Sequence, residues 1–115
     1  MKRLYRLTRS EDINRVRQKG KTFVHKVVVV GVKPNQLGKN RIAVIAGRSL
    51  GGAVQRNQAK RRIRSAIQSL FADLKQGYDI VIIARKLLLD TDYAELLTAL
   101  RKLLSQAELM KVNQN

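Results

Sequence analysis

The spacing of apolar residues changes along the first half of the chain from helical to strand-like. Residues 10–17 combine two spaced apolar positions with acidic residues at the start, which predicts a short helix. Residues 22–33 are rich in valine, and β-branched side chains favour strand. Residues 41–46 favour another strand after a turn-forming segment. The segment 26–46 is therefore expected to form an antiparallel hairpin with a long loop.

The second half of the chain returns to helical spacing. Residues 56–74 place apolar side chains three and four positions apart, which predicts a helix that docks one face on a core. Residues 79–84 form a short apolar run typical of a buried strand. Residues 92–107 carry a leucine stripe, and we expect Asp90 or Thr91 to cap this last helix.

These elements define the expected fold class. The order is α-β-β-β-α-β-α, and it predicts an α+β protein in which a small, mainly antiparallel sheet packs with about three helices in a two-layer sandwich. A length of 115 residues suits one domain over residues 1–115. Residues 110–115 are polar, and we expect them to form a frayed tail.

The charge of the chain points to a polyanionic partner. Lys and Arg number 24 against 8 acidic residues, and the formal net charge is +16. Residues 1–64 contain all of this excess. Nucleic acid is the first candidate partner, because neutralising phosphates releases counterions. The longest apolar run, Val27–Val32, is too short to cross a bilayer, so we expect a cytoplasmic protein. No basic amphipathic helix offers the exposed bulky apolar face that insertion requires, so we expect no membrane partner.

The sequence offers little for catalysis by the protein itself. It has no cysteine and one histidine, His25, which has no catalytic partner at a suggestive spacing. Two-metal hydrolysis needs clustered carboxylates. The two acidic clusters lie at predicted helix starts, where they favour the helix dipole instead. We therefore expect neither catalytic nor metal-binding residues in this chain.

The strongest candidate site is the first half of the helix predicted from residue 56. At about 100° per residue, its apolar side chains share one face and its polar, mostly basic side chains share the adjacent face. Like charges three and four positions apart repel one another, so folding alone does not favour this arrangement. Arginine also forms forked contacts with phosphate. Arg62 lies outside the basic face, and the residues expected to bind RNA are Arg56, Asn57, Lys60, Arg61 and Arg64, assisted by Arg48 in the preceding turn.

The same residues give the chain a family resemblance. The segment from Gly51 through Ala53-Val54, Arg56-Asn57 and Lys60-Arg61 to Arg64 resembles the G-N-A-V-x-R-N-R-x-K-R-x-x-R signature of the bacterial ribonuclease P protein family. Further motifs of the family occur in the same order along about 90–100 residues of this chain. They include Arg3-Leu4, Arg6-Leu7, Asp12, Val16, Gly20, Asp79-Ile80-Val81, Ala84-Arg85, Tyr93 and Leu96. Gln58 departs from the signature, as do Ile13 and Arg17, which stand where family members often carry phenylalanine.

The resemblance implies a function. It implies the protein subunit of a ribonucleoprotein endonuclease, with one protein copy per RNA, that removes the 5′ leader from precursor tRNA. The RNA subunit would hold the catalytic Mg²⁺ ions, and the protein would bind both that RNA and the leader. It also implies a left-handed β-α-β crossover. Residues expected near the leader-binding sheet face are Ile13, Arg17, Phe23, His25, Val28 and Val30. A non-enzymatic RNA-binding or ribosomal protein is the alternative, because it would share the basic first half.

Overall fold

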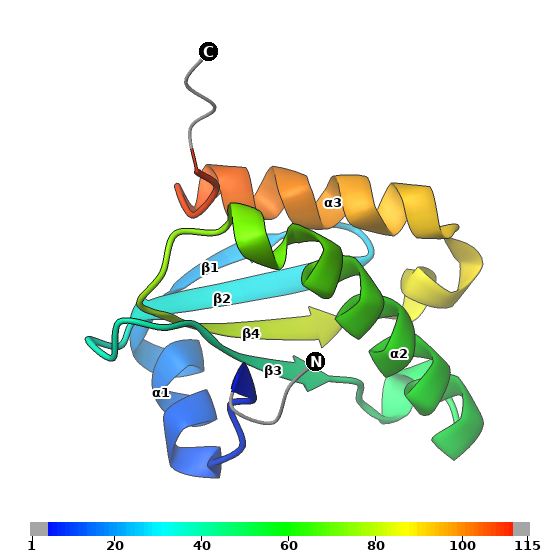
Figure 1. Ribbon diagram of the computed structural model, residues 1–115. Helices are drawn as coiled ribbons and strands as arrows, with labels where there is room; N and C mark the ends of the chain where they lie inside the picture. Colours follow the sequence, from blue (N-terminus) through cyan, green and yellow to red (C-terminus); the bar gives the residue numbers. More distant parts are fainter. Residues whose placement is uncertain (1–4, 112–115) are drawn as a thin grey trace.

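A computed structural model describes residues 5–111 of the chain, and it has the predicted order of elements (Figure 1). The regular elements are α1 (Ser10–Lys19), β1 (Lys21–Val24), β2 (Val28–Pro34), β3 (Arg41–Ile45), α2 (Ala53–Leu70), β4 (Tyr78–Ala84) and α3 (Tyr93–Gln106). Three short 3-10 helices join them, namely η2 (Arg48–Leu50), η3 (Phe71–Asp73) and η4 (Lys86–Asp90). The α+β class expected from the sequence is confirmed.

The four strands form one mixed sheet in the order β1-β2-β4-β3. The β1–β2 and β2–β4 pairs are antiparallel, and the β3–β4 pair is parallel. Helix α2 makes the connection between the two parallel strands. Both strands therefore direct their carboxyl ends toward the end of the sheet where α2 begins (Figure 1).

Each face of the sheet packs against a different set of helices. Helices α2 and α3 cover one face, where the larger core includes Val28, Val30, Ile63 and Leu100. Helix α1 lies against part of the opposite face, over a smaller core that includes Val16. We call this second face the open face, because α1 alone among the described helices packs on it. The expected two-layer sandwich of sheet and helices thus gains a partial third layer.

The predicted hairpin over 26–46 was wrong. A turn at residues 25–27 divides the expected strand into β1 and β2, and β4 separates β2 from β3. Residues 80–83 of β4 are apolar and buried or nearly so on both faces of the sheet. A strand buried on both faces belongs at the centre of a sheet, so β4 occupies the position next to β2.

The ends of the predicted helices also need correction. Helix α2 begins at residue 53, three positions before the expected start. The cap of α3 is Asp92, whose Oδ1 accepts a hydrogen bond from the Glu95 amide at 2.8 Å, rather than Asp90 or Thr91. The expected tail at 110–115 is ordered at its start, since the Lys111 amide donates to the Asp73 carbonyl at 2.8 Å. Residues 112–115 of that tail lie outside the described residues.

Candidate nucleic-acid interface

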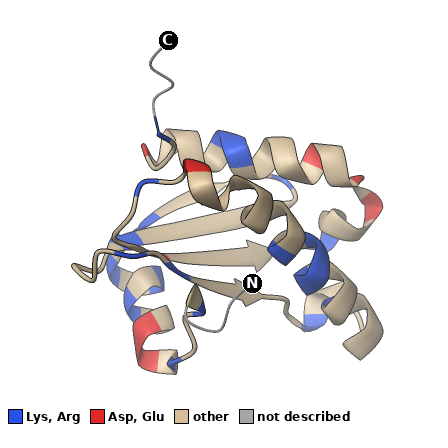
Figure 2. Ribbon diagram, viewed as in Figure 1, with Lys and Arg blue, Asp and Glu red and all other residues tan. Residues whose placement is uncertain are grey.

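Helix α2 displays the predicted division into an apolar and a basic face. Its buried side chains are Ala59, Ile63, Ala66, Ile67 and Leu70, all on the side that packs on the sheet and α3. Burying each isoleucine or leucine contributes about 1.5–3 kcal/mol, so this face fixes the orientation of the helix. The Lys and Arg residues of α2 all lie before residue 65, away from its carboxyl end (Figure 2). We call Arg48, Arg56, Asn57, Lys60, Arg61 and Arg64 the α2 basic face.

No acidic side chain among residues 5–111 forms an ion pair with the α2 basic face. The ion pairs of the described residues involve Asp12, Arg15, Arg41 and Asp79, and none includes a member of this face. Helix α2 contains no acidic residue. Each like-charge pair at helical spacing costs about 0.2–0.5 kcal/mol. The arrangement is thus mildly unfavourable in the isolated protein and becomes favourable beside a polyanion.

The turn before α2 places Arg48 beside the start of the helix. Arg48 begins the 3-10 helix η2 and is exposed. Gly51 follows with a φ of 120°, a conformation that L side chains rarely adopt. The Gly52 amide then donates to Gln55 Oε1 at 3.1 Å, which satisfies one of the free amides at the helix start. Glycine at 51 therefore lets the chain turn from η2 into α2.

Arg62 has a different role from the other α2 cations, as its predicted position outside the basic face suggests. Its Nη1 donates to the Leu88 carbonyl at 3.2 Å, and its Nη2 donates to the Thr91 carbonyl. These carbonyls belong to η4 and the residue that follows it. Arg62 thus anchors the η4 segment to α2, and its charge is directed inward.

Two hollows lie on the open face beside α1. One, of about 230 Å³, is lined by Arg17, Thr22, Val29, Gly31, Val81 and Ile83. The other, of about 180 Å³, includes Ile13, Ala43 and Ile45 and reaches Arg6 and Arg64 at the β3 edge. We call the two hollows together the α1 groove. Its floor is apolar, arginines stand at its rim, and through Arg64 it meets the α2 basic face.

The six residues predicted near the leader fall on both faces of the sheet. Ile13 and Arg17 line the α1 groove. Val28 and Val30, expected near an RNA-binding face of the sheet, are instead fully buried in the core beneath α2 and α3, where no ligand reaches them. Phe23 packs against that same core, and His25 lies in the turn beside α3. The alternating neighbours Val29 and Gly31, which the sequence pattern did not single out, line the groove instead.

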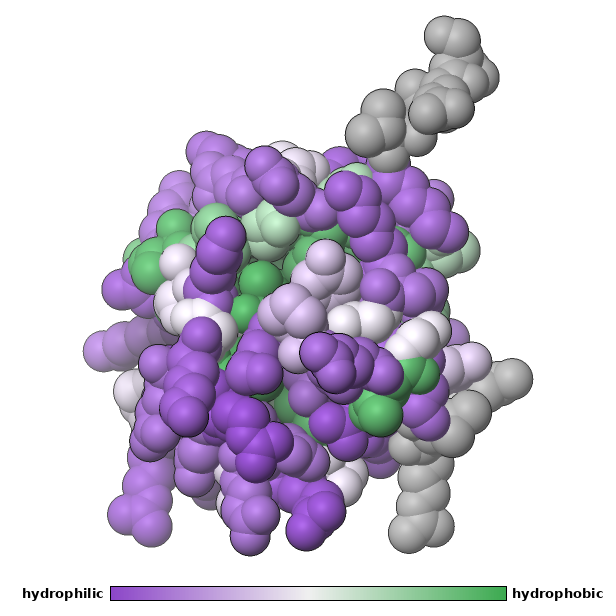
Figure 3. Space-filling model, turned by 90° about the vertical axis from the view of Figure 1, so that its left-hand side faces the viewer, coloured by the Kyte–Doolittle hydropathy of each residue, from purple (hydrophilic) through white to green (hydrophobic). Residues whose placement is uncertain are grey.

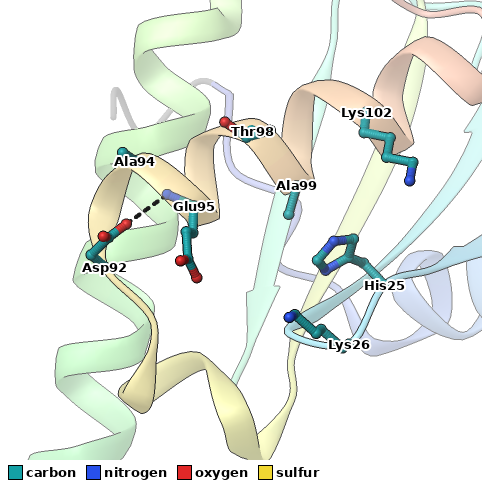
Figure 4. A pocket seen from close by; sticks show the side chains of 8 residues that line it. All are labelled: His25, Lys26, Asp92, Ala94, Glu95, Thr98, Ala99 and Lys102. Atoms are coloured by element: carbon teal, nitrogen blue, oxygen red, sulfur yellow. Dashed lines mark hydrogen bonds between the residues drawn. The ribbon is translucent and has the colours of Figure 1, made fainter.

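His25 sits on the rim of a separate hollow of about 420 Å³ next to α3 (Figure 4). Burial lowers its pKa from the usual value, and the charges of Lys102 and Lys26 lower it further. The Val27 amide donates to His25 Nδ1 at 3.3 Å, which also requires that nitrogen to be unprotonated. Asp92 and Glu95 line the other end of the hollow, so its charge is mixed.

The surface at one end of the sheet is mainly hydrophilic. At the end of the sheet that carries the 35–40 loop, hydrophilic side chains dominate and apolar patches are small (Figure 3). Among residues 5–111, no group of three or more His, Cys, Asp and Glu side chains is arranged to hold a metal ion. The helices of this part of the chain include none that is long and apolar enough to cross a membrane.

The fold and its surface define a small, basic α+β protein with a cationic helix beside an apolar groove. The family model described as Ribonuclease P matches residues 1–108, and the chain belongs to this family. It is 39% identical to the "Ribonuclease P protein component" of Chloroflexus aurantiacus over 116 residues, covering all of this chain and 86% of that protein. It is 38% identical to the protein of the same name from Dehalococcoides mccartyi over 115 residues, covering 99% of this chain and 94% of that protein.

Solved structures show the same fold. The Staphylococcus aureus RNase P protein superimposes with a TM-score of 0.84 at 27% identity, over 93% of this chain and 98% of that one. The Thermotoga maritima RNase P protein superimposes with a TM-score of 0.80 at 28% identity, over 88% of this chain and 96% of that one. The resemblance drawn from the sequence motifs is therefore confirmed across almost the whole chain.

Proposed function

We propose that this protein binds the RNA subunit of ribonuclease P through the α2 basic face and the 5′ leader of precursor tRNA through the α1 groove. The observation that carries the first part is a set of five cations on and beside one helix that form no ion pair with any described residue. Folded RNA offers closely spaced phosphates that would relieve their mutual repulsion. The family assignment favours this function over the ribosomal alternative.

The α1 groove suits single-stranded RNA better than a duplex. A single strand can place bases against an apolar floor while cations follow its backbone. Residues of the floor include Val29, Val81 and Ile83, and Arg17 stands at the rim. No aromatic side chain is among the residues that line either hollow, so stacking would fall to arginine, whose planar group stacks on π-faces. Leader binding should therefore depend strongly on charge.

Bond cleavage belongs, in this proposal, to the RNA subunit. Mg²⁺ ions bound by that RNA and by the substrate would activate the water and stabilise the leaving oxygen. The protein would act by raising the affinity for precursor tRNA and by lowering the Mg²⁺ concentration that cleavage requires. One protein per RNA and a cytoplasmic location complete the proposal.

Reconstitution tests this function directly. The purified chain is mixed with a bacterial ribonuclease P RNA at low Mg²⁺, and the 5′ end of a cleaved precursor tRNA is mapped. We expect correct maturation that neither component gives alone, together with tighter binding of precursor than of mature tRNA. Cleavage by the protein alone, or no stimulation of the RNA, would contradict the proposal. Arg17→Ala should reduce the preference for precursor, while Arg15→Ala, an exposed neighbour outside the groove, should preserve it.

A further inference from the structure

A polar network at one end of the sheet connects α1 to two strands. Asp79 of β4 is buried, and its carboxylate accepts two hydrogen bonds from the Arg41 guanidinium. Arg41 Nε donates to Oδ1 at 2.9 Å, and Arg41 Nη2 donates to Oδ2 at 2.8 Å. Asn35 Nδ2 donates to the same Oδ1 at 2.9 Å. The remaining terminal nitrogen of Arg41, Nη1, lies 3.6 Å from Oδ2 of Asp12 in α1. One guanidinium therefore joins the sheet to the first turn of α1.

The geometry makes Arg41 a fixed rather than a mobile partner. Two parallel hydrogen bonds to one carboxylate hold the guanidinium plane in a single orientation. The hydrogen bond to Asp79 raises the pKa of Arg41, burial opposes that change, and the nearby carboxylates reinforce it. The Asp12 side chain is only 13% exposed. Its ion pair with Arg41 is thus better shielded from water than a typical surface pair.

The other end of α1 is held by close packing. A methyl group at Gly20 would lie 2.5 Å from the carbonyl oxygens of both Val16 and Val32, so the chain after α1 touches β2 directly. Val16 packs over Gly31 of β2, where an added Cβ would come within 3.4 Å of it. Asp12 lies in the first turn of α1 and Gly20 directly follows its last turn, so the groove residues Ile13 and Arg17 lie between these two attachment points.

We propose that the Asp12–Arg41–Asp79 network is a positioning device that fixes α1 over the sheet and so sets the width of the α1 groove for the leader. This inference rests on the proposed function of the groove. Asp12 and Arg41 are positioning residues, since neither lines the two hollows of the groove. Without the ion pair, the segment before α1 keeps its backbone hydrogen bond from the Leu7 amide to the Ile42 carbonyl at 2.8 Å, but the first turn of α1 loses its ion pair with the sheet.

The main test is Asp12→Asn, with Glu11→Gln as the matched control. Both substitutions remove one negative charge from the first turn of α1, but Glu11 is exposed and forms no ion pair within the described residues. Affinity is measured in the reconstituted holoenzyme for precursor tRNA and for mature tRNA, which lacks the leader. Asp12→Asn removes two ion pairs, the shielded one with Arg41 and an exposed one with Arg15 at 3.2 Å. We expect it to reduce the preference for precursor about fivefold, the effect of losing the shielded pair, whereas Arg15→Ala, which removes only the exposed pair, should leave that preference unchanged. Glu11→Gln should leave that preference unchanged.

A distance measurement tests the position of α1 independently of activity. The chain has no cysteine, so Asn14→Cys on α1 and Gln106→Cys on α3, both exposed, give two specific spin-label positions. We expect the distance distribution between the labels to broaden with Asp12→Asn and to stay narrow with Glu11→Gln. Thermal unfolding followed by circular dichroism checks that both variants remain folded.

The outcomes separate the inference from the proposed function. The inference is overturned if Asp12→Asn matches Glu11→Gln in both the distance distribution and the precursor preference. It is also overturned if Asp12→Asn weakens binding of the RNA subunit by the same factor as binding of the leader, because the effect would then be general. If the wild-type holoenzyme shows no preference for precursor, the leader-binding function fails, and the spin-label distances still decide whether the network positions α1.

Discussion

Removing one cation from the α2 basic face should change the salt dependence of RNA binding by a predictable amount. Each phosphate that a cation neutralises on duplex RNA contributes about 0.9 to the slope of log affinity against log salt concentration, if RNA behaves like duplex DNA. Five cations lie together and form no ion pair within residues 5–111, namely Arg48, Arg56, Lys60, Arg61 and Arg64. If all five bind phosphate, the slope is about −4.5, and raising salt from 50 to 200 mM weakens binding about 500-fold.

The substitution Lys60→Ala should reduce that salt effect from about 500-fold to about 150-fold, because about 0.9 is lost from the slope. The double substitution Lys60→Ala, Arg64→Ala should reduce it to about 40-fold. The assay is a salt titration of the affinity for the RNA subunit, by filter binding or fluorescence anisotropy. Arg101→Ala is the control, since Arg101 is an exposed cation of α3 outside the basic face.

Two results would refute this reasoning. If Lys60→Ala weakens binding but leaves the slope unchanged, Lys60 does not neutralise a phosphate and its effect passes through the fold. If Arg101→Ala changes the slope as much as Lys60→Ala does, binding depends on net charge alone. The α2 basic face would then have no special role.

Three further predictions concern stability. Gly20→Ala should lower the free energy of unfolding in urea by about 2 kcal/mol, because the methyl group meets two carbonyl oxygens at 2.5 Å, whereas Gly47→Ala, with no atom within 4 Å, should cost less than about 0.5 kcal/mol. The pKa of His25 is lower in the folded protein than in the unfolded chain, so as the pH falls the unfolded chain binds a proton at this residue before the folded protein does. The free energy of unfolding should therefore decrease as the pH drops below about 6.5, and His25→Asn should remove that decrease between pH 7 and 5. Arg62→Ala should cost about 1–2 kcal/mol and speed hydrogen exchange in η4, while the salt slope of RNA binding stays the same.

The sequence predicted the elements well because their signals are local. The apolar spacing of residues 56–74 follows from the helical repeat alone, and the structure buries that stripe. The α2 basic face is equally local, since the same repeat that groups the apolar side chains also groups the cations. The order of the elements and the basic face were therefore readable without any knowledge of the tertiary fold.

The pairing of strands was not readable in this way. The 26–46 hairpin was expected because neighbouring strands in sequence often pair. Strand β4 instead lies between β2 and β3, although its residue Asp79 is 44 positions away in sequence from Asn35, to which it is hydrogen-bonded. That choice depends on competition between distant segments for burial on both faces of the sheet. The pattern of residues within one segment does not show which distant segment will be buried more fully.

The sequence contained a signal, Gly31, that could have shown which face of the sheet each β2 valine occupies. A run of four valines, Val27–Val30, is apolar at both odd and even positions, so alternation cannot tell the core face from the groove face. Gly31 breaks this symmetry. Glycine within a strand marks a close approach by another part of the chain, and here Val16 of α1 occupies the space above it. Because side chains on one face recur every second residue, Gly31 places Val29 in the groove and Val28 and Val30 in the core, which is the arrangement in the structure.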